Sequence, residues 1–131
     1  MSNNQIKIFI ADDHKLLRES LVLLLSQEDD MAVVGEAEDG VMVEQEVVKA
    51  DVDVLILDIS MPKRSGLDVA KNLLKLNPNL KIIMLTMHKS EDFVATAFES
   101  GVRGYVLKEN VVGELIGGIR PVYEGGIYIS P

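Results

Sequence analysis

Five polar residues come at the ends of short apolar runs, and their types could do chemistry together. They are Asp12, Asp13, Asp58, Thr86 and Lys108. If the runs are parallel strands, their carboxyl ends meet at one edge of a sheet, and the three carboxylates lie within a few ångströms of one another. Two unit charges about 4 Å apart repel by about 4 kcal/mol at an effective dielectric constant of about 20. Such a cluster therefore holds protons or binds a cation.

Oxygen ligands favour a hard cation such as Mg²⁺, because the chain has no cysteine and only two histidines. A metal, a hydroxyl and a lysine together suit phosphoryl transfer, since they neutralise and hydrogen-bond the phosphoryl oxygens. A carboxylate can be the acceptor and form an acyl phosphate. Asp58 is the natural acceptor because it stands alone after its run, whereas Asp12 and Asp13 are adjacent.

Apolar runs rich in β-branched residues predict the strands that position these side chains. The runs are 6–10, 32–34, 54–57, 82–85 and, more weakly, 105–107. The segments between them have helical length and period, so strand and helix alternate five times. We therefore expect an α/β fold with a doubly wound parallel five-stranded sheet, the flavodoxin-like (βα)5 arrangement with strand order 2-1-3-4-5.

Several residues predict where the helices end. Helix 67–76 should stop at Asn77 because Pro78 follows, and Ser90 is a good N-cap for a helix that Gly101 terminates. Val43, Val47 and Ala50 should lie on one face of a second helix. Pro121 should kink or loosen the last helix, because an interior proline costs about 3 kcal/mol.

Composition excludes several classes of protein. The 131 residues fit one domain, with 47% apolar and 26% charged residues. No apolar run approaches the roughly 18 residues of a membrane span, and the polar start lacks a signal-peptide pattern, which predicts a cytoplasmic location without membrane contact. A net charge of −8 argues against DNA binding by this chain itself.

The strand-end residues resemble the receiver domain of two-component response regulators. The resemblance runs from about residue 6 to the last residue, and its four motifs together are specific. They are Ile10-Ala11-Asp12-Asp13-His14, Leu57-Asp58-Ile59-Ser60-Met61-Pro62, Leu85-Thr86 and Gly104-Tyr105-Val106-Leu107-Lys108.

The resemblance implies that Asp58 accepts phosphate from the phosphohistidine of a sensor histidine kinase. Asp13 and Asp58 would ligate Mg²⁺ directly, with the Ser60 carbonyl as a third ligand and Asp12 acting mainly through water.

The resemblance also gives the switch residues. Lys108 would contact the phosphate, Thr86 would be the switch hydroxyl, and Tyr105 the aromatic side chain that changes rotamer on activation. The chain would then be a phosphorylation-dependent signalling switch that dephosphorylates itself slowly, rather than a turnover enzyme.

Finer motifs resemble NarL/FixJ-type regulators, in which a receiver is joined to a LuxR-type helix-turn-helix domain. They are Ala11-Asp12-Asp13-His14, Val34-Gly35-Glu36-Ala37, the segment from Ala97 to Tyr105, and Tyr128-Ile129-Ser130-Pro131. The resemblance implies a receiver over residues 1–131 with a tail from about 125 leading to an absent DNA-binding domain. A stand-alone, chemotaxis-type receiver that acts by protein binding is the alternative. A flavodoxin or a dehalogenase-type phosphatase would need different residues after the first strand.

Further features bear on the site and on partner binding. Many receivers have a cis proline after the lysine, whereas this chain has Glu109. The two histidines also suggest a metal or phosphorelay role, but we interpret His14 as a polar residue at the start of the first helix and His88 as a residue that could modulate loss of the phosphoryl group. Apolar residues Leu16, Val22 and Leu23 extend the first helix beyond one buried stripe, which predicts either a thick core or a homodimer through the first and last helices.

Overall fold

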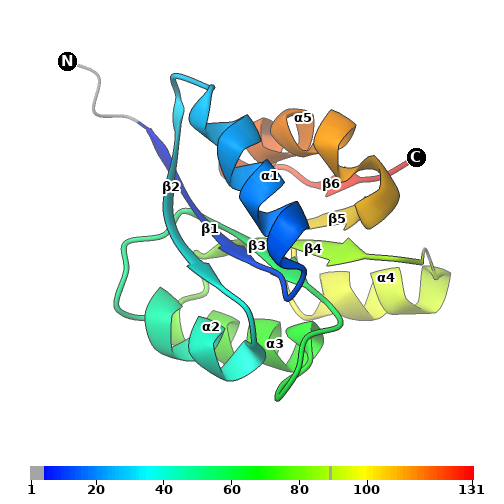
Figure 1. Ribbon diagram of the computed structural model, residues 1–131. Coiled ribbons are helices and arrows are strands. Elements are labelled where there is room, and N and C mark those ends of the chain that lie inside the picture. The colour runs from blue at the N-terminus through cyan, green and yellow to red at the C-terminus, as the bar shows by residue number, and fades with distance from the viewer. Residues whose placement is uncertain (1–4, 89) are drawn as a thin grey trace.

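The computed structural model describes residues 5–88 and 90–131, and strands and helices alternate in it as predicted (Figure 1). The strands are β1 (Ile6–Ala11), β2 (Met31–Ala37), β3 (Val54–Asp58), β4 (Lys81–Thr86), β5 (Gly104–Leu107) and β6 (Tyr128–Ile129). The helices are α1 (Lys15–Ser26), α2 (Gly40–Val47), α3 (Gly66–Leu76), α4 (Glu91–Glu99), the short 3₁₀ helix η1 (Lys108–Asn110) and α5 (Val111–Tyr123).

The sheet is parallel and has the order β2-β1-β3-β4-β5-β6. Its first five positions confirm the predicted order. The sixth strand corrects the expectation of a five-stranded sheet, because part of the predicted tail pairs with β5. The Tyr128 N–H donates to the Arg103 carbonyl (3.0 Å), and the Ser130 N–H donates to the Tyr105 carbonyl (2.9 Å).

Helices cover both faces of the sheet, which explains why β3 and β4 are apolar on both sides. On one face α2, α3 and α4 pack over a core that includes Leu55, Leu57 and Met84. On the other face α1 and α5 pack over a core that includes Ile10 and Ile56. Figure 1 shows the two layers of helices with the sheet between them.

The predicted helix ends are mostly confirmed. Asn77 is the C-cap of α3, and Ser90 is the N-cap of α4, where its side chain accepts from the Phe93 N–H (3.4 Å). Gly101 has a φ of 103°, a value that glycine adopts without steric cost.

Helix α2 is shorter than predicted, whereas α5 includes its proline. Helix α2 ends at Val47, so Ala50 lies in the turn that follows, where its N–H still reaches the Glu46 carbonyl (3.2 Å). Helix α5 continues through Pro121 to Tyr123, and the kink or loosening expected at the proline stays a prediction. Val122 is fully buried in the core, and this packing offsets the missing hydrogen bond of the proline.

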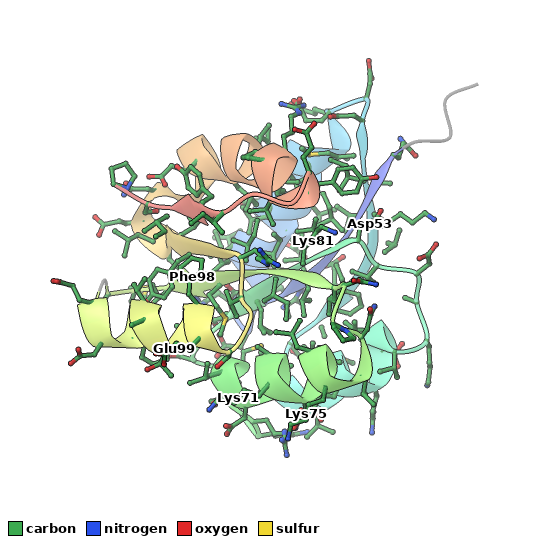
Figure 2. The ribbon with its side chains drawn as sticks, turned by 180° about the vertical axis from the view of Figure 1, so that it is seen from behind. Asp53, Lys71, Lys75, Lys81, Phe98 and Glu99 are labelled. Carbon is green, nitrogen blue, oxygen red and sulfur yellow. The ribbon has the colours of Figure 1, made fainter. Side chains whose placement is uncertain are left out.

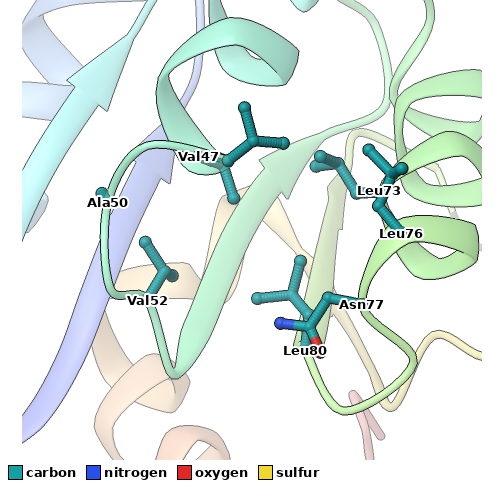
Figure 3. A pocket seen from close by; sticks show the side chains of 8 residues that line it. Val47, Ala50, Val52, Leu73, Leu76, Asn77 and Leu80 are labelled. Atoms are coloured by element: carbon teal, nitrogen blue, oxygen red, sulfur yellow. The ribbon is translucent and has the colours of Figure 1, made fainter.

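The amino-terminal edge of the sheet is the opposite edge from the chemistry-bearing residues. A groove of about 290 Å³ lies there between the ends of α2 and α3 (Figure 3), lined mainly by apolar side chains. Nearby, the Lys81 N–H donates to the Asp53 carbonyl (3.3 Å), which ties β4 to the residue before β3 (Figure 2).

Candidate functional site

The strand register brings the predicted site residues to one edge of the sheet. Ala11 lies opposite Leu57, so Asp12 follows β1 beside the end of β3. Asp58 lies opposite Leu85, and Thr86 lies opposite Leu107. Each of these polar side chains therefore follows the last apolar residue of its strand, as the apolar runs predicted.

Lys108 brings two buried carboxylates together. Its Nζ lies 2.9 Å from Asp58 Oδ2 and 3.1 Å from Asp12 Oδ2. The Lys108 side chain is 6% exposed, and the two aspartates are 2% and 0% exposed. An ion pair this deeply buried is stable only while both signs of charge are present.

Asp58 is held from two sides at the end of β3. The Ser60 N–H donates to its Oδ1 (3.1 Å), and Lys108 donates to its Oδ2. The Gly66 N–H donates to the Ile59 carbonyl (2.8 Å), and a Cβ at Gly66 would collide with the Asp58 carbonyl oxygen. Helix α3 therefore begins against the backbone of the Asp58 loop and fixes its position.

Burial and the neighbouring charges together shift the pKa values of Asp58 and Lys108. Burial raises the pKa of Asp58 to about 6, although the hydrogen bond from Lys108 opposes that rise, and the Asp12 charge adds to it. Burial alone would lower the pKa of Lys108, but Asp58 and Asp12 together raise it above its usual value. The lysine is therefore a permanent cation, whereas Asp58 can exchange a proton near neutral pH.

Asp13 and His14 complete the cluster on its open side. The His14 Nδ1 lies 3.1 Å from Asp12 Oδ1, 3.3 Å from Asp13 Oδ1 and 3.1 Å from Lys108 Nζ. His14 was predicted to be a polar residue at the start of the first helix rather than a metal ligand, and it is the N-cap of α1. Its adjacency to Asp12 and Asp13 was the one signal that it could also belong to the site.

The donor atoms of this cluster fit a divalent cation. One ligand atom from each of Asp12, Asp13, His14 and Asp58 lies within 4.8 Å of the others. Asp12 Oδ2 is buried and has no hydrogen-bond partner, so the ion pair with Lys108 is its only described compensation. A bound cation would neutralise the cluster further. The predicted ligand role of the Ser60 carbonyl stays a prediction.

Thr86, Tyr105 and the backbone of His88 meet beside the cluster. The Thr86 hydroxyl donates to the His88 carbonyl (3.0 Å) and accepts from the His88 N–H (3.3 Å). The Tyr105 hydroxyl donates to the same carbonyl (3.4 Å) from a side chain that is 1% exposed. Burial raises the pKa of Tyr105, partly offset by the Thr86 hydroxyl. The two predicted switch residues are thus linked through one backbone carbonyl.

The segment after Lys108 differs from the pattern of many receivers. Glu109 lies in η1, and the described peptide bonds include no cis bond. Lys108 nevertheless reaches both aspartates, so this cluster forms without a proline after the lysine.

Sequence comparison identifies the family. The response regulator receiver domain family matches residues 8–120. The chain belongs to this family. Its sequence is 41% identical over 127 residues to that of the oxygen regulatory protein NreC of Staphylococcus carnosus. The match covers 96% of this chain and 58% of NreC. The chain is 37% identical to the transcriptional regulatory protein DegU of Brevibacillus brevis, covering 100% of this chain and 56% of DegU.

Solved structures place the receiver among NarL/LuxR-type response regulators. A LuxR-family two-component response regulator from Aurantimonas superimposes with a TM-score of 0.92 at 28% identity, covering 97% of this chain and 91% of that one. The receiver domain of the putative regulator NarL from Mycobacterium tuberculosis gives a TM-score of 0.87 at 28% identity, covering 93% and 98%. The predicted family, subfamily and fold are thereby confirmed.

The receiver spans less than three fifths of the curated relatives that it matches. Receiver domains serve two-component signalling as switches rather than as metabolic enzymes, and they bind Mg²⁺ through acidic residues such as those clustered here. Within residues 5–88 and 90–131, every helix is too short or too polar to cross a membrane.

Proposed function

We propose that this receiver accepts a phosphoryl group on Asp58 from the phosphohistidine of a sensor histidine kinase. The observation that carries the proposal is the buried contact of Lys108 with both Asp58 and Asp12 beside the exposed Asp13. An Asp58 carboxylate oxygen attacks phosphorus, the P–N bond to the donor imidazole breaks, and the imidazole leaves. Attack by water on the acyl phosphate then returns Asp58 to a carboxylate and releases inorganic phosphate.

The residues around Asp58 divide the remaining work. Mg²⁺, held by Asp13 and Asp58 with Asp12 acting through water and the Ser60 carbonyl as a further ligand, would supply positive charge to the phosphoryl oxygens. Lys108 contributes a second cation that is already in place.

The switch acts through Thr86. Its hydroxyl turns from the His88 carbonyl toward a phosphoryl oxygen, which removes one of the two hydroxyl donors to that carbonyl and frees Tyr105 to change rotamer. The surface formed by α4, β5 and α5 then differs between the two states, and partners that prefer one state shift the equilibrium. His88 lies in the loop between β4 and α4, two residues after Thr86, so its side chain could modulate loss of the phosphoryl group.

Asp58→Asn should abolish labelling by a small phosphodonor such as acetyl phosphate, because an amide cannot form the acyl phosphate. Intact-mass measurement with Mg²⁺ and with EDTA checks this, and wild-type labelling should require Mg²⁺. Asp51→Asn is the control, since Asp51 is an exposed aspartate before β3, at the other edge of the sheet. Labelling of Asp58→Asn equal to wild type would assign the acceptor elsewhere.

The output we propose is transcription control from the cytoplasm. Residues 1–131 would form the receiver, with the segment from about 125 leading to a helix-turn-helix domain that alone contacts DNA. The greater length of the relatives supports this, and one structural neighbour is described as two RcsB dimers bound to two parallel DNAs. A stand-alone receiver acting by protein binding is the alternative, and the length of the encoding gene separates the two.

We also propose a homodimer through α1 and α5. Leu16 and Leu23 of α1 are 78% and 64% exposed, and Val112 of α5 is 59% exposed. Val22, by contrast, is partly buried against the core and does not belong to this surface. The described structure therefore supports a partner surface for Leu16 and Leu23 rather than a thick core.

Leu23→Gln should weaken dimerisation in the presence of Mg²⁺ and beryllium trifluoride, a phosphoryl mimic, by roughly tenfold because it removes buried apolar area. Sedimentation velocity over a concentration series measures this. Leu76→Gln is the matched control, since Leu76 is 72% exposed on α3 across the sheet. A wild-type receiver that stays monomeric, or equal effects of both substitutions, would contradict the proposed surface.

A further inference from the structure

Ser130, which follows β6, is a buried polar residue that the chemistry proposed above does not use. It is 1% exposed, whereas Ile129 and Pro131 on either side of it are exposed. Burial of a hydroxyl costs free energy unless the hydroxyl is hydrogen-bonded. The hydrogen bonds of this side chain therefore indicate why it is buried.

The Ser130 hydroxyl completes the hydrogen bonds of β5 at the point where β6 ends. The Ser130 N–H donates to the Tyr105 carbonyl (2.9 Å), and the Leu107 N–H donates to the Ser130 hydroxyl oxygen (3.0 Å). The hydroxyl thus takes the place of the backbone carbonyl that a longer neighbouring strand would offer. Leu107 directly precedes Lys108. Ser130 therefore helps to fix the backbone from which the Lys108 side chain reaches the two buried aspartates.

Glu114 of α5 determines the direction of this hydroxyl. A serine hydroxyl has one proton and two acceptor lone pairs. The Ser130 hydroxyl donates its proton to Glu114 Oε1 (2.6 Å), which leaves its lone pairs for the Leu107 N–H. The Tyr128 hydroxyl donates to the same carboxylate oxygen (2.8 Å). Glu114 lies in the first turn of α5, where the helix dipole favours the ionised form, which can only accept.

Close packing keeps β6 within reach of Glu114. The Tyr128 ring lies against Gly118, where a Cβ would come within 3.1 Å of the ring. The Gly126 N–H donates to the Pro121 carbonyl (2.8 Å), which folds the chain back along α5. Glycine at position 118 thus lets β6 approach α5 closely enough for the Glu114 contacts. Packing and polar contacts together tie β6 to both α5 and β5.

We propose that Glu114, acting through the Ser130 hydroxyl, is a positioning residue for Lys108 in phosphoryl transfer. The inference rests on the proposed function for the reaction itself. Lys108 Nζ lies 2.9 Å and 3.1 Å from its two carboxylate oxygens, so a small displacement of its backbone changes both contacts. A displaced ammonium group stabilises the charge of the transferring phosphoryl group less well.

The time course of labelling by acetyl phosphate with Mg²⁺, followed by intact mass, tests the proposal. Glu114→Ala should slow labelling by roughly fivefold, because the lysine is no longer held in place. Ser130→Ala should slow it to a similar extent. Glu114→Gln should stay within about twofold of wild type, because its amide oxygen still accepts from Ser130. Glu124→Ala is the matched control and should label like wild type, since Glu124 is an exposed glutamate at the other end of α5.

A resonance of Lys108 separates positioning from a merely structural role. Its side-chain ¹⁵Nζ and ¹³Cε resonances, assigned by their loss in Lys108→Met, should shift in Glu114→Ala and Ser130→Ala. They should keep their wild-type positions in Glu114→Gln and Glu124→Ala.

Three results would overturn the inference: labelling of Glu114→Ala at the wild-type rate, Glu114→Gln as slow as Glu114→Ala, or slowed labelling with unshifted Lys108 resonances. Absence of Asp58 labelling in the wild type would instead reject the proposed function. Shifted Lys108 resonances in Glu114→Ala would still support the route from Glu114 to the lysine in that case.

Discussion

In metal-free buffer near pH 7, Lys108→Met should lower the free energy of unfolding by about 3–5 kcal/mol. The substitution keeps a long apolar side chain but removes the cation that lies 2.9 Å from Asp58 Oδ2 and 3.1 Å from Asp12 Oδ2. Both carboxylates are almost fully buried, so they would be left charged in a region that excludes water. Uptake of a proton by the pair limits the loss, which should therefore shrink as the pH falls.

Mg²⁺ should restore much of that stability, because it replaces the lost positive charge. The increase in free energy of unfolding on adding saturating Mg²⁺ should be larger for Lys108→Met than for wild type. Denaturant unfolding with EDTA and with Mg²⁺ measures both quantities. Lys71→Met is the control, since Lys71 points away from the sheet on α3 (Figure 2). The same Mg²⁺ effect in both proteins would show that Lys108 and the metal do not share the carboxylates.

The stability of the metal-free receiver should fall as the pH rises from about 4 to about 6. The pKa of Asp58 is about 6 in the folded chain and 3.8 when unperturbed, so in this interval the unfolded chain has already released a proton that the folded chain still holds. Folding then requires proton uptake, and the total loss is about 3 kcal/mol, because each pKa unit corresponds to about 1.4 kcal/mol.

Asp58→Asn removes this dependence. The free energy of unfolding of Asp58→Asn minus that of wild type should therefore rise by about 2 kcal/mol between pH 4 and pH 7 in EDTA, which is most of the full change. Urea denaturation at several pH values checks it, with the exposed Asp92→Asn as the control for loss of a carboxylate. A difference that stays constant across this pH range would show that burial does not raise the pKa of Asp58. Saturating Mg²⁺ should reduce the difference, since a bound cation favours the ionised carboxylate.

Much of the fold could be predicted because each local signal agreed with the tertiary structure. The doubly apolar runs at 54–57 and 82–85 became the fully buried β3 and β4, and Asn77 and Ser90 capped the helices as expected. The sixth strand could not be predicted in this way. Two residues are too short to show a period, and Tyr128–Ile129 is held by backbone bonds to Arg103 and Tyr105 rather than by a pattern of its own.

Some parts of the site could likewise be predicted from the sequence, and others could not. Strand ends in one sheet are brought together by topology, so the convergence of Asp12, Asp58 and Lys108 followed from the strand order alone. The direction of the His14 ring depends on side-chain geometry at the N-cap, for which the sequence has no periodic signal. The link between Thr86 and Tyr105 could not be predicted from the sequence either, because it passes through the backbone carbonyl of His88.

The short sixth strand also bears on how the protein avoids self-association through its sheet. Without β6, strand β5 would be the edge strand, and Gly104 and Tyr105, which pair with Tyr128 and Ile129, would present unpaired backbone groups that are a template for aggregation. With β6 in place, the edge strand is only two residues long. The hydroxyl of the following Ser130 donates to the Glu114 carboxylate (2.6 Å), which holds Ser130 against α5. At the other edge, the irregular register between Ile8 and Phe9 disturbs the pairing of β2. Both edges of the sheet are therefore poor templates for pairing with a further strand. Contacts between two receivers are then expected at the helical surfaces instead.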